Sequence, residues 1–513
     1  MSQSNPVPSQ PERTLVMKFG GTSVGSPEAM AMAVKIVQDT QRDWPRLVVV
    51  TSALSGVTDL LLKSATQAAQ GDNQTFSNVA ETLRQKHSAI ATTMLPDARL
   101  RQEVTAKIER LAAEFGSLCQ AIYVLGEATP RALDAVAAMG ERMCIRLLAG
   151  CLRSGGTAAE AIEASRLIVT DDKFQSAHPD FAATTRQTRQ VLLPLLDKQV
   201  VPVVTGFLGA TPAGVTTTLG RGGSDYSAAI LGAALPASEV WIWTDVDGVM
   251  TADPRLVPGA ATIPELTYKE VSELAYFGAK VLHPKTIRPV IDAGIGLRVC
   301  NTFNPAHPGT RLVADHSSPS DGVIKAVTAI RGLQLITVEG RGMLGVPGVA
   351  ARTFGAVAAT GTSVPLISQA SSEQSICFAV PSEAASRVIQ AVEKALAYEI
   401  AENDIDRVWA TGEMVIITVV GAGMRNTPGV SGRVFSVPGW WSPPTSYSKT
   451  SAPIVTRSVP CPIGLPWVGK KIAPSVDSVD LRRVVIKAIA EAAAAALSLC
   501  PLTSASMFLR RTS

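Results

Sequence analysis

The chain as far as Ala314 alternates short apolar runs with longer amphipathic segments. The apolar runs predict β-strands at Leu15–Phe19, Leu47–Val50, Leu167–Thr170, Val200–Thr205 and Val240–Thr244. Helical periodicity is clear between the first two runs, at Pro27–Gln41. Strands that alternate with helices indicate a parallel sheet covered on both faces. The pattern therefore predicts an α/β fold with a mainly parallel sheet for residues 14–314.

A different order of elements begins near Val323. It predicts strands at 335–339, 363–368 and 374–380, with helices at 348–358 and 382–397. This βαββα order predicts a small ferredoxin-like module over residues 323–400. The pattern then restarts: VEGRGMLGVPGVAARTF from Val338 is similar to VVGAGMRNTPGVSGRVF from Val419. We interpret the similarity as an internal repeat, with a second module that starts within residues 411–436.

The second module breaks off, and residues 437–513 have no apolar periodicity that would complete it. They hold nine of the 33 prolines and three of the seven tryptophans, and only Leu481–Leu499 has a helical pattern. Such a proline density argues against a continued helix or sheet. A shifted reading frame or a wrong gene model is the favoured interpretation, and a genuine, poorly ordered extension is the alternative. The polar, proline-containing residues 1–13 are also expected to be disordered.

Composition excludes several classes of protein. The 513 residues are 46% hydrophobic and 18% charged, which excludes a wholly disordered chain. Residues 437–513 hold nine Lys/Arg and three Asp/Glu, a net charge of +6, whereas the whole chain has a net charge of +4. The rest of the chain is therefore near neutral. It lacks the excess of positive charge that is typical of nucleic-acid-binding proteins. The longest late apolar run, Ala488–Leu502, contains Glu491 and is too short to span a membrane.

The N-terminus lacks the apolar core of a signal peptide, and the seven cysteines are odd in number and irregularly spaced. A disulfide framework or a zinc site is therefore not expected. Free thiols in a reducing cytoplasm fit this pattern.

Two glycine-rich loops follow predicted strands and open helices. Lys18 precedes the first, which holds Gly20 and Gly21, and Leu219–Asp225 forms the second. Glycines let backbone N–H groups approach an anion, and a helix start favours phosphate. A further strand runs into the acidic turn Thr244–Gly248, whose spacing does not match a calcium loop. P-loop, protein-kinase and dinucleotide-binding signatures are absent from the sequence.

Taken together, the motifs resemble the aspartokinase family, which has the amino-acid kinase fold. The resemblance runs from Leu15 to Phe435. It rests on KFGGTSV at 18–24, SALSGVTDLL at 52–61, GER at 140–142, TLGRGGSDYSA at 218–228, WTDVDGVMTADPR at 243–255 and FGAKVLHP at 277–284. The resemblance implies an α/β/α sandwich followed by paired ACT regulatory modules, of which the second is incomplete here.

The resemblance also implies a reaction, the transfer of the γ-phosphoryl group of ATP to the side-chain carboxylate of L-aspartate. Both reactants are anions, so catalysis must supply positive charge and alignment rather than a general base. Lys18 resembles the lysine that stabilises the transition state, and Asp225 the acidic residue that orients it. Mg²⁺ would bind mainly through the ATP phosphates, and no residue is assigned to a metal.

Other site residues are carried over from the same motifs. Arg221 resembles the partner of the substrate α-carboxylate, and Glu141 the partner of its α-ammonium group. The remaining implied substrate-binding residues are Ser52, Thr58 and Ser224. The implied nucleotide-binding residues are Gly20, Gly21, Thr244, Asp245, Arg255 and Lys280.

Gln369-Ala370-Ser371-Ser372-Glu373 resembles a signature of aspartokinases that are fused to homoserine dehydrogenase. The resemblance implies an effector site at Gln369, Gly348 and Val349, with threonine a better candidate than lysine. It also implies a homo-oligomer assembled through ACT modules, an assembly that the broken second module is expected to impair. No strand–GxGxxG–helix unit follows Phe435, so the chain is expected to correspond to the kinase half of such a protein.

Two other functions stay open at this point. One is a non-catalytic, amino-acid-sensing scaffold that keeps the kinase fold. The other is a kinase for a different amino acid or for carbamate. Lys18, Arg221 and Asp225 argue against the first, and Glu141 together with Arg221 argues against the second.

Overall fold

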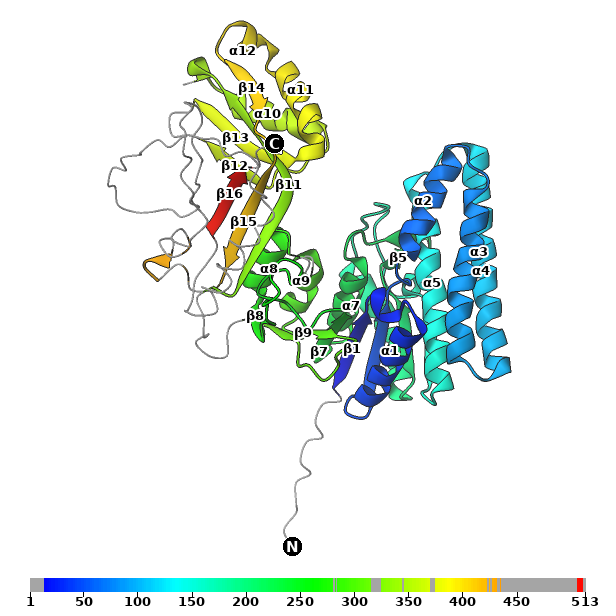
Figure 1. The fold of residues 1–513 in the computed structure, drawn as a ribbon. Coiled ribbons are helices and arrows are strands. Elements are labelled where there is room, and N and C mark those ends of the chain that lie inside the picture. Colours follow the sequence, from blue (N-terminus) through cyan, green and yellow to red (C-terminus); the bar gives the residue numbers. More distant parts are fainter. Residues whose placement is uncertain are drawn as a thin grey trace. The chain divides into compact units, whose positions relative to one another are not determined.

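The structure is a computed structural model. It describes residues 13–279, 282, 284–314, 324–343, 346–369, 374–421, 424, 427–430, 434 and 505–510. These residues divide into two compact units. Unit 1 consists of residues 1–249, 262–272 and 281–317, and unit 2 of residues 250–261, 273–280 and 318–513 (Figure 1). The units do not follow the chain order, because two short segments ahead of residue 314 belong to unit 2. The domain boundaries drawn from the sequence stay predictions.

Unit 1 contains an eight-stranded sheet in the order β3-β4-β2-β1-β7-β9-β10-β8. Its strands are β1 (Thr14–Phe19), β2 (Arg46–Thr51), β3 (Ala159–Ile162), β4 (Val201–Thr205), β7 (Glu239–Thr244), β8 (Glu265–Thr267), β9 (Gly296–Asn301) and β10 (Thr310–Val313). All neighbours pair in parallel except β9 and β10. A separate hairpin consists of β5 (Leu208–Ala210) and β6 (Thr216–Thr218). The prediction of a mainly parallel sheet is confirmed.

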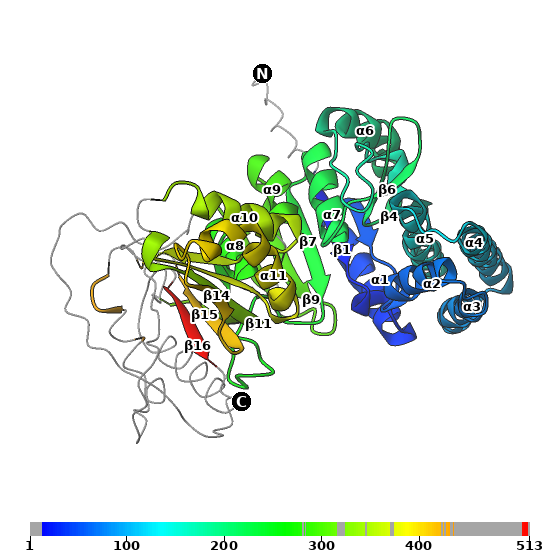
Figure 2. The ribbon, with the colours of Figure 1, turned by 90° about the horizontal axis from the view of Figure 1, so that it is seen from above.

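Helices cover the sheet on both faces (Figure 2). The elements are α1 (Pro27–Gln41), α2 (Val57–Ala69), α3 (Thr75–Met94), α4 (Ala98–Leu125), α5 (Pro130–Ser154), α6 (Phe181–Asp197), α7 (Gly223–Ala234), α8 (Tyr268–Tyr276), α9 (Pro284–Asp292) and the 3₁₀ turns η1 (Thr22–Val24) and η2 (Ala164–Arg166). One face of β1 and β2 packs with α1 to α5 in a single apolar core, which includes Leu15, Met17 and Leu47. On the other face, α7 contacts β1 and β2.

Local chemistry explains the first of these helices. Ser26 is extended and accepts a hydrogen bond from the Ala29 N–H at 3.2 Å, and Pro27 occupies the first helical position. The apolar positions Met30, Ala33, Val34 and Val37 recur at helical spacing and are buried. The predicted helix Pro27–Gln41 is confirmed at both ends.

One predicted strand is wrong. Residues 167–170 follow η2 and make only isolated bridges, Val169 with Ala210 and Thr170 with Pro179. The strand at the β4 edge of the sheet is instead β3, whose sequence AEAI has little β-character. Parallel pairing of Ala159–Ile162 with Val201–Val204 decides its conformation, and this long-range pairing leaves no local sequence signal.

Unit 2 contains a second sheet. Its elements are β11 (Ala326–Glu339), η3 (Arg341–Met343), α10 (Val349–Ala359), β12 (Leu366–Gln369), β13 (Ser375–Pro381), η4 (Ser382–Ala384), α11 (Ala385–Ala395), α12 (Ala397–Ala401), β14 (Arg407–Ala410), β15 (Met414–Val420) and β16 (Ala505–Arg510). The C-terminal half of β11 pairs with β13 and β14, and β12 pairs with β13, all antiparallel. With α10 and α11 this makes a βαββαβ module, whose last strand, β14, the sequence pattern does not predict.

The N-terminal half of β11 pairs with β15, the strand that begins the second repeat. Ala326–Ile330 pairs with β15, and the register shifts between Ile330 and Leu333 around Gly332, whose φ is +68°. A left-handed backbone conformation at this point favours glycine, which has no Cβ. The predicted repeat has a structural counterpart, because Gly348 and Gly429 hold equivalent positions in it with φ of +88° and +84°. Val430 and Val434 are helical, as predicted. The predicted helix Leu481–Leu499 lies outside the described residues, whereas residues 505–510 pair with β15.

Three further findings concern membrane spans, metal ligands and cysteines. Among the described residues, no helix has the length and apolar character of a membrane span. No group of His, Cys, Asp and Glu in this part of the chain could hold a metal ion. The five cysteines that the structure describes are free and buried, and burial raises the pKa of Cys144 to about 12.

Candidate active site

The carboxyl ends of β1, β2, β4, β7 and β9 meet at one edge of the unit 1 sheet, because these strands are parallel. Ligands of open α/β sheets bind at this edge. Most of the sequence-predicted site residues of unit 1 lie on the turns and helix starts that follow these strand ends.

Lys18 and Asp225 form the central ion pair of this edge. Lys18 lies in β1, in register with Val50 of β2 and Ile242 of β7, and Asp225 lies in the first turn of α7. The Lys18 Nζ is 2.6 Å from an Asp225 carboxylate oxygen, with the side chains 11% and 21% exposed. This pairing orients the ammonium group and leaves part of it accessible to a ligand.

The first glycine loop lies directly beside this ion pair. The Gly20 N–H donates to the Trp243 carbonyl at 3.2 Å, and a Cβ at Gly20 would lie 3.6 Å from the Lys18 Nζ. At Gly21 a Cβ would lie 2.9 Å from the Ala53 carbonyl oxygen, so only glycine fits there without movement. The loop therefore keeps the space next to the ammonium group free of side chains, and an anion such as a phosphate fits it.

Ser52 and Thr58 follow the second strand of the chain: Ser52 comes directly after β2, and Thr58 lies in the first turn of α2. The Ser52 N–H donates to the Phe19 carbonyl at 3.1 Å, which joins the ends of β1 and β2. Gly56 precedes α2 with φ of +75°, and this left-handed residue lets the chain turn into the helix that carries Thr58. Both side chains are half-buried, with room for polar contacts to a ligand.

Among the acidic residues of the site, Glu141 has the most strongly shifted pKa. It lies in the middle of α5 and is 3% exposed. Burial raises the pKa of Glu141 to about 8, opposed only in part by hydrogen bonds from its own backbone and from that of Ala53. One carboxylate oxygen is buried without a hydrogen-bond partner. A buried acid of this kind becomes stable as a carboxylate when a cation such as an ammonium group binds beside it.

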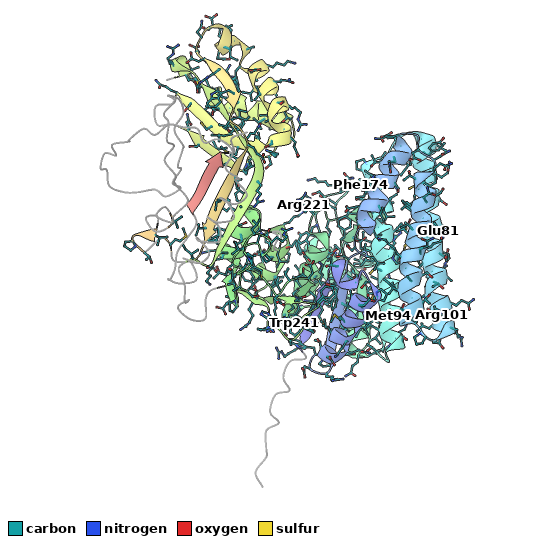
Figure 3. All side chains as sticks on the ribbon, in the orientation of Figure 1. Glu81, Met94, Arg101, Phe174, Arg221 and Trp241 are labelled. Atoms are coloured by element: carbon teal, nitrogen blue, oxygen red, sulfur yellow. The ribbon has the colours of Figure 1, made fainter. Side chains whose placement is uncertain are left out.

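Arg221 and Ser224 lie in the second glycine loop. Gly220 and Gly222 flank Arg221 with φ of +78° and +71°, and the arginine is exposed (Figure 3). Ser224 approaches the end of β4 closely, since a Cβ at Gly206 would lie 2.6 Å from the Ser224 Cβ. An exposed guanidinium on a short loop can turn to a carboxylate and bind it through two hydrogen bonds.

Asp134 joins the loop at Gln175 to the start of the second glycine loop at Thr218, and it is not among the residues predicted from the sequence. Its buried carboxylate accepts hydrogen bonds from the Gln175 N–H, the Thr218 N–H and the Thr218 hydroxyl, between 2.8 and 3.1 Å. Burial raises the pKa of Asp134, and these hydrogen bonds oppose the shift. Asp134 precedes Glu141 by two turns of α5, and this spacing on one helix face was the available signal.

The predicted nucleotide-binding residues are only partly brought together. Thr244 ends β7, donates to Asp245 at 3.1 Å, and its carbonyl accepts from the Thr302 N–H at 2.9 Å. Asp245 is exposed at the same edge. Arg255 pairs with Asp253 at 2.7 Å and belongs to unit 2, and Lys280 lies outside the described residues.

A cluster of side-chain amides that the sequence motifs do not predict also lies at this edge. The side-chain amides of Asn301 and Asn304 both donate to the same Asp247 oxygen, at 2.9 and 3.0 Å. These bonds tie the turn after β7 to the turn after β9. Asp247 was within a recognised motif, whereas the two asparagines lie in a segment that carried no sequence signal.

The predicted effector residues lie in unit 2. Gln369 ends β12 and is exposed, Gly348 precedes α10 in a left-handed conformation, and Val349 is buried. Among the described residues, no side-chain hydrogen bond joins Gln369 to the other two. The effector site stays a prediction.

Comparisons with known proteins agree with this geometry. The amino acid kinase family model matches residues 13–301, and an ACT domain model matches residues 336–396. The chain is 36% identical to a bifunctional aspartokinase/homoserine dehydrogenase of Daucus carota over 82% of this chain and 46% of that protein. It is 34% identical to aspartokinase 3 of Arabidopsis thaliana over 77% of this chain and 67% of that protein.

Solved structures show the same relationship. The crystal structure of E. coli aspartokinase III in complex with aspartate and ADP has a TM-score of 0.67 and 31% identity, covering 83% of this chain and 91% of that one. The same enzyme in complex with lysine and aspartate also has a TM-score of 0.67 and 31% identity, covering 85% and 94%. The chain spans about half the length of the first bifunctional relatives it matches. By family model, sequence and structure, this chain belongs to the amino acid kinase family and, within it, to the aspartokinases.

Proposed function

We propose that this chain transfers the γ-phosphoryl group of ATP to the β-carboxylate of L-aspartate, giving 4-phospho-L-aspartate and ADP. The observation that carries the proposal is the Lys18–Asp225 pair, at 2.6 Å, beside a glycine loop with space for a phosphate. The crystal structure of E. coli aspartokinase III is a complex with aspartate and ADP, which supports the same two classes of ligand here.

The chemistry requires positive charge, because nucleophile and donor are both anions. An aspartate carboxylate is ionised at neutral pH, so no base has to remove a proton. In the proposed mechanism the Lys18 ammonium contacts the transferred phosphoryl oxygens and the incoming carboxylate. It neutralises charge as the bond to the bridging oxygen of ADP breaks and the acyl–phosphate bond forms.

Substrate recognition would use both ends of the amino acid. Glu141 would take the α-ammonium group, which supplies the cation that its buried carboxylate lacks. Arg221 would take the α-carboxylate, with Ser52, Thr58 and Ser224 as hydrogen-bonding neighbours. Gly20, Gly21, Thr244 and Asp245 would line the nucleotide side, and we assign Arg255 and Lys280 to it from their motifs. Mg²⁺ would be held mainly by the ATP phosphates.

The reaction would be the first step of lysine, threonine, methionine and isoleucine biosynthesis in the cytoplasm. An amino-acid effector would bind unit 2 at Gln369, Gly348 and Val349, with threonine a better candidate than lysine. The ACT modules would pair in a homo-oligomer. The ACT domain match supports an effector of this class, as does the E. coli structure with lysine.

The test is aspartate-dependent ADP release, with the acyl phosphate trapped as its hydroxamate. Wild-type protein should form hydroxamate, and Lys18→Ala should form almost none. Lys35→Ala is the matched control, because Lys35 is exposed on α1 away from the sheet edge. A folded wild-type protein that binds ATP but forms no hydroxamate would support the non-catalytic scaffold. Turnover with carbamate or another amino acid, in place of aspartate, would overturn the substrate assignment.

A further inference from the structure

Two buried hydroxyl groups join segments that follow different strands of the unit 1 sheet. Ser23 lies in η1, just after the first glycine loop, and Thr302 comes directly after β9. The Thr302 hydroxyl donates to the Ser23 hydroxyl at 2.7 Å, and both residues are fully buried. Thr302 lies outside the sequence motifs of the candidate active site, so this bond brings a further residue to that edge of the sheet.

The two hydroxyl groups meet across the end of β7. The strand order is β1-β7-β9, so the segments after β1 and β9 are separated by β7. The Ser23 hydroxyl donates to the Trp243 carbonyl at 3.4 Å, and the Thr302 N–H donates to the Thr244 carbonyl at 2.9 Å. The hydroxyl pair therefore joins the carboxyl ends of three parallel strands.

The Trp243 carbonyl connects this network to the first glycine loop. It accepts a hydrogen bond from the Gly20 N–H at 3.2 Å as well as the one from Ser23. The Ser23 N–H in turn donates to the Gly20 carbonyl at 3.0 Å. On its other side the loop lies close to the segment after β2, since a Cβ at Gly21 would lie 2.9 Å from the Ala53 carbonyl oxygen. The loop is thus held between two strand ends, and Ser23 belongs to the side that faces β7.

We infer that Thr302 is a positioning residue for the nucleotide, because through Ser23 it fixes the first glycine loop against the end of β7. Backbone groups that bind a phosphate must be held within a fraction of an ångström, and they cannot adjust as a long side chain can. Removing the Thr302 hydroxyl leaves Ser23 without its donor in a fully buried place, so the loop loses this support. The inference rests on the proposed function, since it takes the loop as the site of the ATP phosphates.

A positioning role predicts an effect on one substrate only. The residues assigned to aspartate lie on other elements, Glu141 on α5 and Arg221 just ahead of α7. Loss of the Thr302 hydroxyl should therefore raise the KM for ATP and leave the KM for aspartate nearly unchanged. A bond that served only the stability of the fold would not separate the two KM values.

Isothermal titration calorimetry of the full chain with Mg-ADP tests the inference without requiring turnover. Thr302→Val keeps the shape of the side chain and should weaken ADP binding about three- to tenfold. Thr302→Ser keeps the hydroxyl and should restore most of the affinity. Ser23→Ala removes the same bond from the other side and should weaken ADP at least as much. The double variant should bind no more weakly than Ser23→Ala alone, because both substitutions remove one shared bond.

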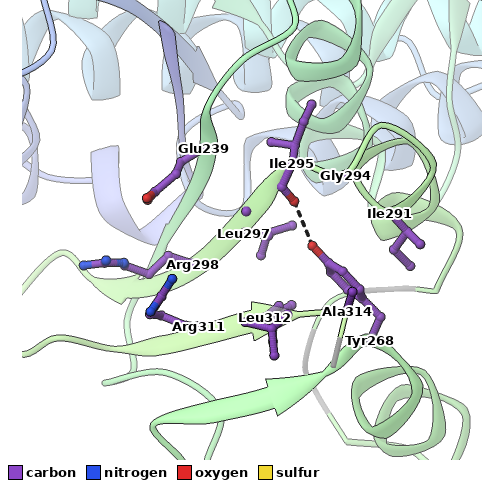
Figure 4. Close-up of a pocket in the computed structure, with 12 residues that line it drawn as sticks. Glu239, Tyr268, Ile291, Gly294, Ile295, Leu297, Arg298, Arg311, Leu312 and Ala314 are labelled. Carbon is purple, nitrogen blue, oxygen red and sulfur yellow. Dashed lines mark hydrogen bonds between the residues drawn. The ribbon is translucent and has the colours of Figure 1, made fainter. Parts of the chain in front are cut away.

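The matched control removes a buried hydroxyl bond at the opposite edge of the same sheet. The Tyr268 hydroxyl donates to the Ile295 carbonyl at 2.8 Å, beside a pocket of about 180 Å³ where β9 begins (Figure 4). Tyr268→Phe should lower the urea midpoint, as Thr302→Val does, because each loses one buried hydrogen bond. It should leave ADP affinity and both KM values unchanged.

Three results would contradict these expectations. Unchanged ADP affinity in both Thr302→Val and Ser23→Ala would overturn the inference and leave the proposed function standing. Equal rises in the KM for ATP and for aspartate in Thr302→Val would also overturn it, because they would indicate a general loss of structure. A folded wild-type protein that does not bind Mg-ADP would overturn the proposed function and the inference together.

Discussion

The Lys18 ammonium group and the Asp225 carboxylate lie 2.6 Å apart, although one residue is in the first strand of the sheet and the other begins α7. Both side chains are largely buried, so water screens the pair less than it would a surface ion pair. The carboxylate thereby holds the ammonium group in one place, beside the glycine loop. Catalysis by charge and alignment requires such a fixed cation.

Removing either partner of this pair should reduce turnover without unfolding the protein. We expect Lys18→Ala to lower kcat by about 10²–10³. Asp225→Asn should lower kcat by less, about tenfold to 10², because the lysine stays present but loses its orientation. Initial rates of hydroxamate formation at saturating ATP and aspartate measure both. An unchanged kcat in Lys18→Ala would rule out the assigned role.

Glu141 should make aspartate binding depend on pH. The carboxylate form is the one that pairs with an ammonium group, and the pKa of Glu141 is raised to about 8. Below that pH most of the protein carries a neutral Glu141, so apparent affinity should rise about tenfold per pH unit and level off above pH 8. Aspartate titrations at several pH values between about 6 and 8.5 measure the slope.

Glu141→Gln should bind aspartate weakly and without this slope. The same substitution tests stability: the folded pKa is raised, so the stabilising effect of the proton is complete below about pH 4.5 and is lost as pH rises through about 8. Urea midpoints of the variant should therefore vary less over this range than those of wild type. An identical slope in the variant would assign the pH dependence to another group.

The glycine at position 140 sets the distance between α5 and the start of α2. A Cβ there would lie 2.7 Å from the Ala53 Cβ and 3.1 Å from the Val57 Cγ1. Gly140→Ala should destabilise the protein by about 1–3 kcal/mol. It should also raise the KM for aspartate, because Ser52 and Thr58 flank the contact. Denaturant midpoints and aspartate titrations measure the two effects.

Gly116→Ala is the matched control for this substitution. Gly116 also lies inside a long helix, α4, but a Cβ there would meet nothing within 4 Å. It should stabilise the protein by about 0.5–1 kcal/mol through helix propensity alone. Equal losses of stability in both variants would show that the Ala53 contact does not decide the outcome.

The buried His87 should make the protein sensitive to acid. It lies in α3 with its ring nitrogen 2.7 Å from the Leu83 carbonyl, and burial lowers its pKa to about 4. Its folded pKa is depressed, so the stability it confers is present above about pH 6.5 and is lost as pH falls toward about 4. His87→Leu should therefore lose less stability than wild type between about pH 7.5 and pH 5, by about 2 kcal/mol. The exposed His178→Gln should behave as wild type does.

Asp134 should act as a positioning residue for the substrate loop. Asp134→Asn replaces an acceptor with an amide whose N–H groups face the donors of Gln175 and Thr218. We expect a loss of about 1–3 kcal/mol in stability and a higher KM for aspartate, with the KM for ATP unchanged. Asp97→Asn, at the start of α4, is the control, because asparagine caps a helix as well as aspartate. An equal rise in both KM values would indicate general unfolding instead.

Much of the local structure could be predicted from the sequence. Burial patterns along Leu15–Phe19 and the Ser26–Pro27 start of α1 are local, so short-range chemistry decides them. The Gly348 and Gly429 turns were predictable for the same reason. Residues 159–162 and 407–410 were not, because the partners that make them strands lie far away in the chain.

The sequence by itself determined the fold class, the two glycine loops and the residue types of the candidate active site, since each depends on spacing within a short segment. Only the tertiary structure decided that Lys18 pairs with Asp225 and that Glu141 is buried with a raised pKa. These properties depend on strand register and on packing between distant segments. The pKa of an ionisable side chain shifts only when folding removes water from around it and brings charged or hydrogen-bonding groups beside it.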